Sequence, residues 1–224
     1  MEQLEEWYEE VEESLNEISQ ADPLFDVDTT KKRLSAIFQK VHKAIALVFQ
    51  MLPEITEVLP HTDQKAFTQA LGDIAGIASV LTKNMAPAFE CMVEGGSLQN
   101  VLEITEQTLE TLYQVARHVY EQQHYEEASG LFCLLSLLNP AYTSFWLGLG
   151  NAEYCLGKYT EALLAYSFAA QTDNANPFCH IYCARCHMAL NNRDGAKIAL
   201  SLAESVADEP ISKKEISRLK EEIR

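Results

Sequence analysis

The chain has 224 residues, of which 47% are hydrophobic, and its formal net charge is −16. This length and apolar content allow one large or two small globular domains with a substantial core. The excess of acid argues against nucleic acid and anionic membrane surfaces as partners, because both are bound through clustered Lys and Arg.

The start of the chain and its cysteines indicate a cytoplasmic setting. Residues 1–28 hold eight Glu and three Asp and no basic residue, whereas a secretory signal begins with basic and then apolar residues. The longest apolar stretches are too short to span a bilayer, so we expect no membrane insertion. The six cysteines lie within helical patterns, which favours reduced thiols over a disulfide scaffold.

Helical periodicity dominates residues 1–95, which we predict to form an N-terminal helical region. Residues 2–19 form an acidic amphipathic pattern, and Pro23 breaks it. Further helices are expected at about 30–51 and 62–84, with a turn or two at 86–93. Gly95-Gly96 then marks the clearest boundary of the chain.

Beyond this boundary the sequence repeats itself at an interval of 34 residues. Ser97 can cap a long helix that runs through Ile104 and Leu109 into the first repeat. The repeats start near Leu109, Thr143 and Pro177. A period of 34 residues is that of the tetratricopeptide repeat, a helix–turn–helix unit that buries its apolar face only by stacking on copies of itself. We therefore predict an all-α fold, with three such repeats over residues 97–208 and a C-terminal helix at 211–224.

Matching places in the repeats carry the residues that this fold needs. Counting from each repeat's first residue, the eighth place holds Gly150 in the middle repeat, where it lets two helices approach closely. Helix B of each repeat has an alanine at the tight crossing: Ala128, Ala162 and Ala196. The turn between the helices contains Gly157 or Asn191, residues that accept a left-handed conformation.

The first helix of each repeat projects a set of places onto the concave face, which we predict to be a peptide-binding groove. Its fifth and twelfth places are apolar or aromatic, which suits an extended peptide with hydrophobic side chains. The candidate groove residues are Tyr113, Arg117, Tyr120, Leu147, Asn151, Tyr154, Ile181, Arg185 and Met188. The alternative for any one tyrosine is burial by a flanking helix or by the chain's own N-terminus. Repeat proteins that clamp acidic carboxylate tails use Lys, Arg and Asn at these places, so that ligand class is disfavoured.

One group of three cysteines has the spacing of a metal-cluster ligand motif. Cys179, Cys183 and Cys186 have the C-x3-C-x2-C spacing of radical S-adenosylmethionine iron–sulfur enzymes. Here they fall on a repeat helix, with the last two at inward-facing places, so packing is the favoured interpretation. The acidic start lacks a calcium-binding loop, and no phosphate loop or nucleophile elbow occurs. We expect no enzyme, no metal and no cofactor.

From Leu109 to Ala207 the chain resembles the class II chaperones of bacterial type III secretion, which hold translocator proteins before export. The resemblance rests on six segments: Leu112 to Ala116, Tyr125 to Ala128, Phe132 to Pro140, Phe145-Trp146-Leu147-Gly148-Leu149-Gly150, Leu156-Gly157-Lys158-Tyr159-Thr160-Glu161-Ala162, and Cys186 to Leu190. It covers somewhat under half of the chain. The family normally has only a short helical arm before its repeats, and members often dimerise through that arm.

This resemblance implies an acidic cytosolic chaperone that binds an extended segment of a translocator protein in its groove and releases it without ATP. It implies a protein partner, with a homodimer possible. The second interpretation is a structural or regulatory adaptor of the secretion apparatus that uses residues 1–95 as its main interface.

Overall fold

The computed structural model describes residues 43, 68–70, 72–73, 97–101 and 103–223. The helices predicted at 2–19, 30–51 and 86–93 and the Gly95-Gly96 boundary lie outside these residues, apart from Lys43, which is helical. Residues 68–70 and 72–73, within the helix predicted at 62–84, are helical as well.

Every regular element in the described part of the chain is an α-helix, which confirms the predicted fold class. In chain order these helices are α6 (Leu98–Val101), α7 (Glu106–Glu121), α8 (Tyr125–Leu138), α9 (Thr143–Cys155), α10 (Tyr159–Thr172), α11 (Pro177–Ala189), α12 (Arg193–Val206) and α13 (Pro210–Ile223). None of the helices in this part has the length and apolar character of a membrane span.

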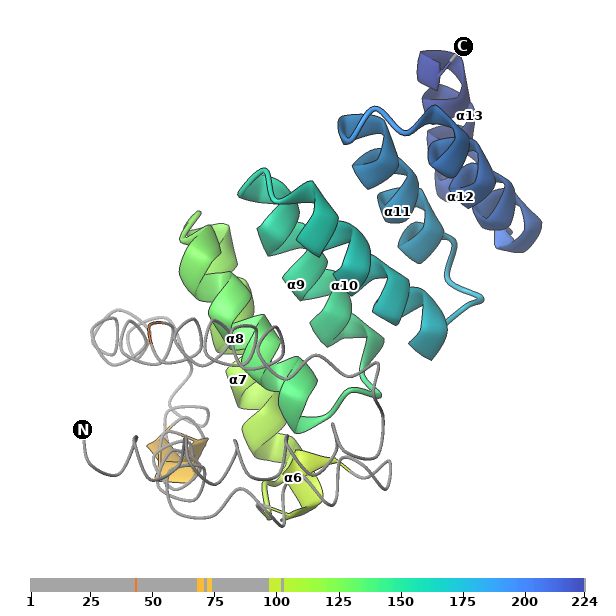
Figure 1. Ribbon diagram of the computed structural model, residues 1–224. Helices are drawn as coiled ribbons and strands as arrows, with labels where there is room; N and C mark the ends of the chain where they lie inside the picture. The colour runs from red at the N-terminus through yellow and green to blue at the C-terminus, as the bar shows by residue number, and fades with distance from the viewer. Residues whose placement is uncertain (1–42, 44–67, 71, 74–96, 102, 224) are drawn as a thin grey trace, which may run out of the picture. The chain divides into compact units, whose positions relative to one another are not determined.

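The helices come in pairs that follow the period of the sequence. The second helices, α8, α10 and α12, begin at Tyr125, Tyr159 and Arg193, each 34 residues after the one before. The first helices of the last two pairs, α9 and α11, begin at the predicted repeat starts Thr143 and Pro177. Within each of these two pairs the helices run antiparallel (Figure 1). The predicted C-terminal helix is α13, displaced by one residue.

The turns inside the three pairs share one backbone geometry. Gln123, Gly157 and Asn191, again 34 residues apart, have φ values of 65°, 75° and 57°. In the middle turn the Gly157 N–H donates to the carbonyl of Tyr154 at 3.0 Å, and the Lys158 N–H donates to that of Glu153 at 3.0 Å. The other two turns have the same pair of bonds. This is the Schellman motif, which satisfies the last carbonyls of a helix and reverses the chain.

The long helix predicted from Ser97 into the first repeat is wrong, because the chain breaks it between α6 and α7. Glu103 has a φ of 53°. Two residues later the Thr105 hydroxyl accepts a hydrogen bond from the Thr108 N–H at 3.1 Å, which caps the start of α7. The apolar period continues through Ile104 and Leu109, and this continuity hid the break from the sequence pattern.

The chain divides into two compact units, and the division falls within α7. One unit comprises residues 1–115 and 137–139, and the other comprises residues 116–136 and 140–224. In the described part of the first unit, Gln99 donates to the carbonyl of Ile104 at 3.2 Å and to the Glu106 carboxylate at 2.8 Å. Asn139 donates to the Gln99 side-chain oxygen at 2.6 Å. A buried glutamine with these bonds fixes the entry into α7.

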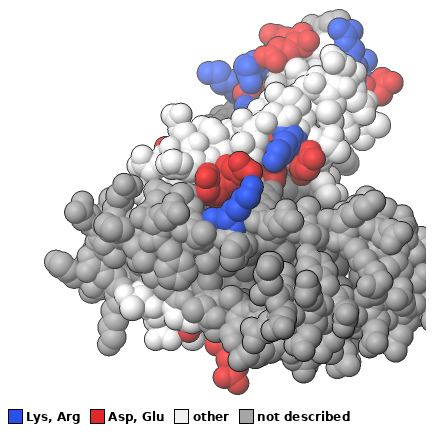
Figure 2. All heavy atoms as spheres, turned by 60° about the vertical axis from the view of Figure 1, so that its left-hand side comes forward, with Lys and Arg blue, Asp and Glu red and all other residues white. Residues whose placement is uncertain are grey.

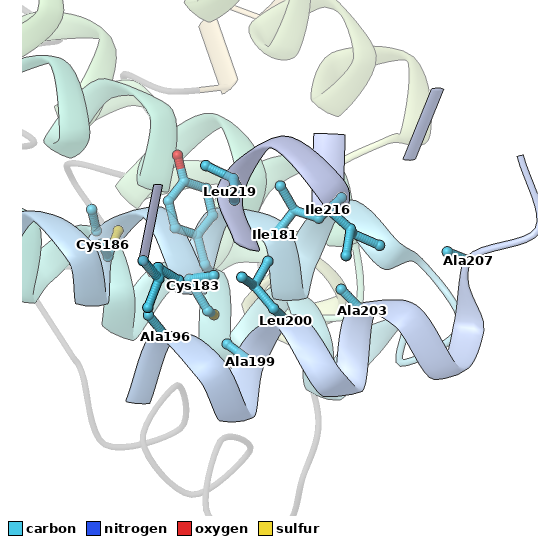
Figure 3. Packing of buried hydrophobic residues seen from close by; sticks show 14 residues of the cluster. Ile181, Cys183, Cys186, Ala196, Ala199, Leu200, Ala203, Ala207, Ile216 and Leu219 are labelled. Carbon is cyan, nitrogen blue, oxygen red and sulfur yellow. The ribbon is translucent and has the colours of Figure 1, made fainter. Parts of the chain in front are cut away.

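One core cluster of the second unit lies between α10, α11, α12 and α13. It is built mainly from small and aliphatic side chains, including Ala196, Leu200 and Ala203 of α12 and Ile216 and Leu219 of α13 (Figure 3). The predicted crossing alanines Ala128, Ala162 and Ala196 are completely buried. Alanine at these places brings the paired helices close together, as the repeat pattern requires.

Candidate peptide-binding surface

Two glycines set the distance between α9 and its neighbours. A Cβ atom added at Gly150 would lie 2.5 Å from Cε1 of Tyr166 on α10. A Cβ atom added at Gly148 would lie 2.4 Å from Cε1 of Phe132 on α8. Both aromatic side chains are buried. The close approach of α9 and α10 predicted at Gly150 is therefore confirmed. The faces of α9 that carry Gly148 and Gly150 pack on α8 and α10, respectively, so a ligand can contact only the other faces of α9.

The predicted groove tyrosines at the twelfth places are held by the tyrosines that open the following helices. The Tyr120 ring meets the Tyr125 ring edge to face, with centroids 5.3 Å apart. Tyr154 and Tyr159 repeat this arrangement at 5.2 Å. Such edge-to-face pairs favour one ring orientation. Tyr120 and Tyr154 are half-buried, so each keeps part of its surface for a ligand.

The hydroxyl groups of these tyrosines stay protonated at neutral pH. Burial, followed by the hydrogen bond with Cys155, raises the pKa of Tyr120 well above its ordinary value. Burial also raises the pKa of Tyr154. The Tyr120 hydroxyl lies 3.4 Å from the exposed Cys155 Sγ. A protonated hydroxyl can donate to a carbonyl, which is the group that an extended peptide presents most often.

A hydrogen bond from the buried Tyr166 orients the side chain of Asn151. The Tyr166 hydroxyl donates to Asn151 Oδ1 at 2.7 Å. Burial raises the pKa of Tyr166 far above its ordinary value, so this hydroxyl remains a donor. Because its oxygen accepts this bond, the Asn151 amide directs its NH2 group toward other acceptors. Leu147, one turn earlier on α9, is half-buried and packs against the core cluster.

The other predicted groove residues have different surroundings. Arg117 is exposed and lies 3.5 Å from the Glu121 carboxylate on the same helix. Met188 is half-buried and packs on the core cluster. Tyr113 is half-buried, but it belongs to the first compact unit, whereas Arg117, Tyr120 and the residues of α9 and α11 belong to the second. The candidate peptide-binding surface therefore consists of residues of the second unit and does not include Tyr113.

Ile181 does not belong to an open surface, which corrects its place among the candidate groove residues. Its side chain is 0% exposed and lies in the core cluster beside Ile216 and Leu219 of α13 (Figure 3). Arg185, one turn further along α11, donates to the Glu215 carboxylate of α13 at 2.5 Å. The sequence predicts the C-terminal helix but not its contact with these two residues. The apolar spacing of Ile216, Leu219 and Ile223, which form the buried face of α13, indicates that this helix packs on the array but not which residues it covers.

The three cysteines of the C-x3-C-x2-C motif are core residues. Cys179, Cys183 and Cys186 are buried, and burial raises the pKa of Cys179 and of Cys186 to about 12. Thiols in such surroundings are protonated and unreactive. Among the described residues, no group of three or more His, Cys, Asp or Glu is placed to hold a metal ion. Their burial agrees with the packing interpretation.

Charges on the described surface are mixed. Figure 2 shows basic and acidic side chains gathered in common clusters and separated by large uncharged areas. The described residues include the ion pairs of Arg218 with Glu222 at 2.8 Å and of Lys220 with Glu204 at 2.6 Å.

Comparisons with known proteins agree with this geometry. No protein-family model matches the chain. It is 34% identical over 131 residues to the low calcium response locus protein H of Yersinia pseudotuberculosis, covering 58% of this chain and 78% of that protein.

Two solved structures share the arrangement of the helices. A type III secretion complex from Aeromonas hydrophila matches with a TM-score of 0.56 and 28% identity, over 61% of this chain and 93% of that one. The Yersinia enterocolitica secretion chaperone SycD, in complex with a peptide of the translocator YopD, matches with a TM-score of 0.51 and 32% identity. That match covers 54% of this chain and 95% of SycD. The chain therefore belongs to the family of class II, tetratricopeptide-repeat chaperones of type III secretion translocators.

Proposed function

We propose that this protein is a non-enzymatic chaperone that binds an extended segment of a translocator protein and keeps it competent for export. The observation that carries the proposal is the family membership, together with the partly exposed residues Tyr120, Leu147, Asn151 and Tyr154 on one set of repeat helices. SycD binds a peptide of its translocator YopD. A bound chaperone hides apolar cargo surface that would otherwise aggregate.

The surface suits a peptide with apolar anchors. Leu147 and the rings of Tyr120 and Tyr154 offer apolar contact area. The Asn151 amide and the tyrosine hydroxyls can donate to peptide carbonyls. Tyrosine combines a large contact area with little loss of side-chain entropy, which favours its use in recognition. No catalytic step is part of the proposal, and the bacterial cytoplasm is the proposed location.

Self-association is a second property that we propose to test. SycD has been crystallised as an alternative dimer. Sedimentation of the full-length chain with and without cargo should show whether a dimer forms and whether cargo dissociates it.

Co-expression with a cognate translocator tests the main proposal. We expect the wild-type chain to keep the translocator in the soluble fraction, and the paired substitutions Tyr120→Ala and Tyr154→Ala to lose most of it. Ile198→Ala is the matched control, because Ile198 is an exposed apolar residue (64%) on α12 outside the candidate surface. Unchanged cargo solubility in the tyrosine variants would instead favour the adaptor interpretation, in which residues 1–95 make the main interface.

A further inference from the structure

The third helix pair differs from the second at the places that would contact a peptide. Leu147 at the fifth place of the second pair is half-buried, whereas its equivalent Ile181 is completely buried. The difference comes from α13, because Ile181 shares the core cluster with Ile216 and Leu219 (Figure 3). α13 thus supplies apolar side chains to a place where a ligand's side chain would otherwise pack.

The polar residue at the ninth place of the third pair, Arg185, is also bound by α13. Arg185 stands at the ninth place, the equivalent of Asn151, and its guanidinium donates to the Glu215 carboxylate at 2.5 Å. The Arg185 Cζ also lies 5.5 Å from the centre of the Tyr182 ring, within the range of a cation–π contact. Arg218 donates to the same carboxylate at 2.6 and 3.0 Å.

The carboxylate is therefore ionised whenever the protein is at neutral pH. Hydrogen bonds from Arg218, and then from Arg185, lower the pKa of Glu215 to about 2. α13 is fixed further along by the contact between Lys220 and Glu204 at 2.6 Å and at its start by the buried Ser212, which donates to the Glu209 carbonyl at 2.9 Å.

We propose that α13 is an intramolecular ligand of the third helix pair, and that it limits cargo recognition to the surface around Tyr120 and α9. This inference rests on the proposed chaperone function, and it adds which kind of cargo segment the chaperone prefers. Ile216 and Leu219 take the place of apolar cargo side chains on Ile181, and Glu215 takes the place of a cargo carboxylate on Arg185.

The occupied third pair defines the chemistry of the preferred segment. Packed helices lie about 10 Å apart, and an extended chain advances about 3.3 Å per residue. Two apolar anchors about three residues apart therefore suffice to reach from Tyr120 to Leu147 and Tyr154. An acidic residue beyond these anchors gains nothing, since the guanidinium that could bind it already holds Glu215.

Two peptides and two matched variants test this inference on the full-length chain. The short peptide carries two apolar anchors about three residues apart, and the long peptide adds a leucine and an aspartate at the end that reaches α11. Glu215→Gln removes the carboxylate that holds Arg185. Glu222→Gln is the control, because Glu222 also contacts Arg218 but does not contact Arg185.

The two peptides should bind the wild-type chain and Glu222→Gln with equal affinity, within about twofold. The Glu215→Gln variant should bind the long peptide about threefold to fivefold more tightly than the short one, the range for one partly exposed ion pair. Deuterium uptake over residues 210–223 should be higher in Glu215→Gln than in the wild type, because α13 loses its ion pair with Arg185.

Equal gains from the acidic extension in the wild type and in Glu215→Gln would show that Arg185 is available, and would overturn the inference. It would also be overturned if Glu215→Gln showed neither a preference for the long peptide nor increased uptake in α13. Failure of both peptides to bind any variant would have a different meaning, because it would remove the proposed peptide-binding function itself.

Discussion

At the scale of single residues, the candidate surface depends on side chains whose orientation is fixed by contacts with neighbouring tyrosines. Tyr125 and Tyr159 pack on the edges of Tyr120 and Tyr154, and Tyr166 fixes the amide of Asn151. A peptide that binds such a surface loses less free energy to the ordering of side chains than one that binds flexible groups. Substitutions of the supporting residues should therefore weaken binding without touching the peptide.

Tyr166→Phe tests this support. The substitution removes one hydroxyl and leaves the ring that packs on Gly150. We expect the free energy of unfolding to fall by about 1 kcal/mol, the usual net value of one hydrogen bond, and cargo affinity to fall because Asn151 is released. Chemical denaturation and calorimetric titration measure the two effects. Tyr182→Phe is a control that keeps the Asn151 bond, and an equal loss of affinity in it would contradict the role given to Tyr166.

The turns provide a second test at this scale. Gln123 and Gly157 occupy the same left-handed position, which costs a residue with a side chain about 1 kcal/mol or more. Gly157→Ala should destabilise the protein by about 1 kcal/mol, since the added methyl group has open space and only the backbone is strained. Gln123→Gly should stabilise it by about 0.5 kcal/mol, after the entropic cost of glycine is subtracted.

Thermal unfolding measures both changes. Gln122→Gly is the control for the second variant, because the neighbouring Gln122 is exposed and is not among the residues with positive φ. It should destabilise the chain. Stabilisation by Gln122→Gly equal to that by Gln123→Gly would show that the backbone conformation is not the cause.

These residues also show how far the sequence could lead. The 34-residue period predicted the helix pairs, the crossing alanines, Gly150 and the left-handed turns, because each follows from a local requirement that recurs in every repeat. The break at Glu103 could not be predicted, since the apolar spacing continues across it. The burial of Ile181 could not be predicted either, because it depends on where a helix 35 residues later packs, and repeat periodicity carries no information about that.

At the scale of helices, α13 joins the array through an apolar face and one network of charges. Glu215 accepts hydrogen bonds from both Arg218 and Arg185, and its pKa lies at about 2, below its ordinary value of 4.5. A carboxyl group whose pKa is lowered by folding contributes stability above its unfolded pKa. This contribution is lost as the pH falls from about 4.5 toward 2.

The pH dependence of Glu215→Gln follows from this sign. At pH 7 the variant should be less stable than the wild type by at most about 1 kcal/mol, since both arginines are partly exposed to solvent. The difference should shrink between pH 4.5 and about 2, where the wild-type carboxylate takes up its proton. Urea unfolding at several pH values measures it. A difference that stays constant over this range would show that Glu215 contributes through packing and not through its charge.

The crossing of α9 and α10 is a second feature at this scale. The Cβ atom of Gly150→Ala would lie 2.5 Å from the Tyr166 ring, so the helices must separate or the ring must shift. We expect a loss of about 1–3 kcal/mol of stability, the usual cost of overpacking. Denaturant unfolding of Gly150→Ala, Tyr166→Leu and the double variant would measure the coupling. Strictly additive losses would argue against a direct clash.

At the scale of the whole molecule, we propose that the repeat array has one peptide-binding surface. The partly exposed residues of this surface lie on α7 and α9, whereas on α11 the fifth place, Ile181, is buried and the ninth place, Arg185, is paired with Glu215 of α13. Cys155 lies at the edge of this surface, next to the hydroxyl of Tyr120, and its thiol is exposed. Cys179, Cys183 and Cys186 are buried, which makes Cys155 a reporter of the surface.

Alkylation of Cys155 in the presence of a translocator segment shows whether cargo binds over Tyr120 and α9. With the segment at about ten times its Kd, the rate of Cys155 modification should fall about tenfold, in proportion to the free fraction of the chaperone. A cysteine introduced by Ile198→Cys, on α12 outside the surface, should react at an unchanged rate in the same sample. Peptide mapping by mass spectrometry follows both sites. If the segment binds over this surface, Cys155 alone should be protected from modification. Equal modification of Cys155 with and without saturating segment would show that the segment does not bind there.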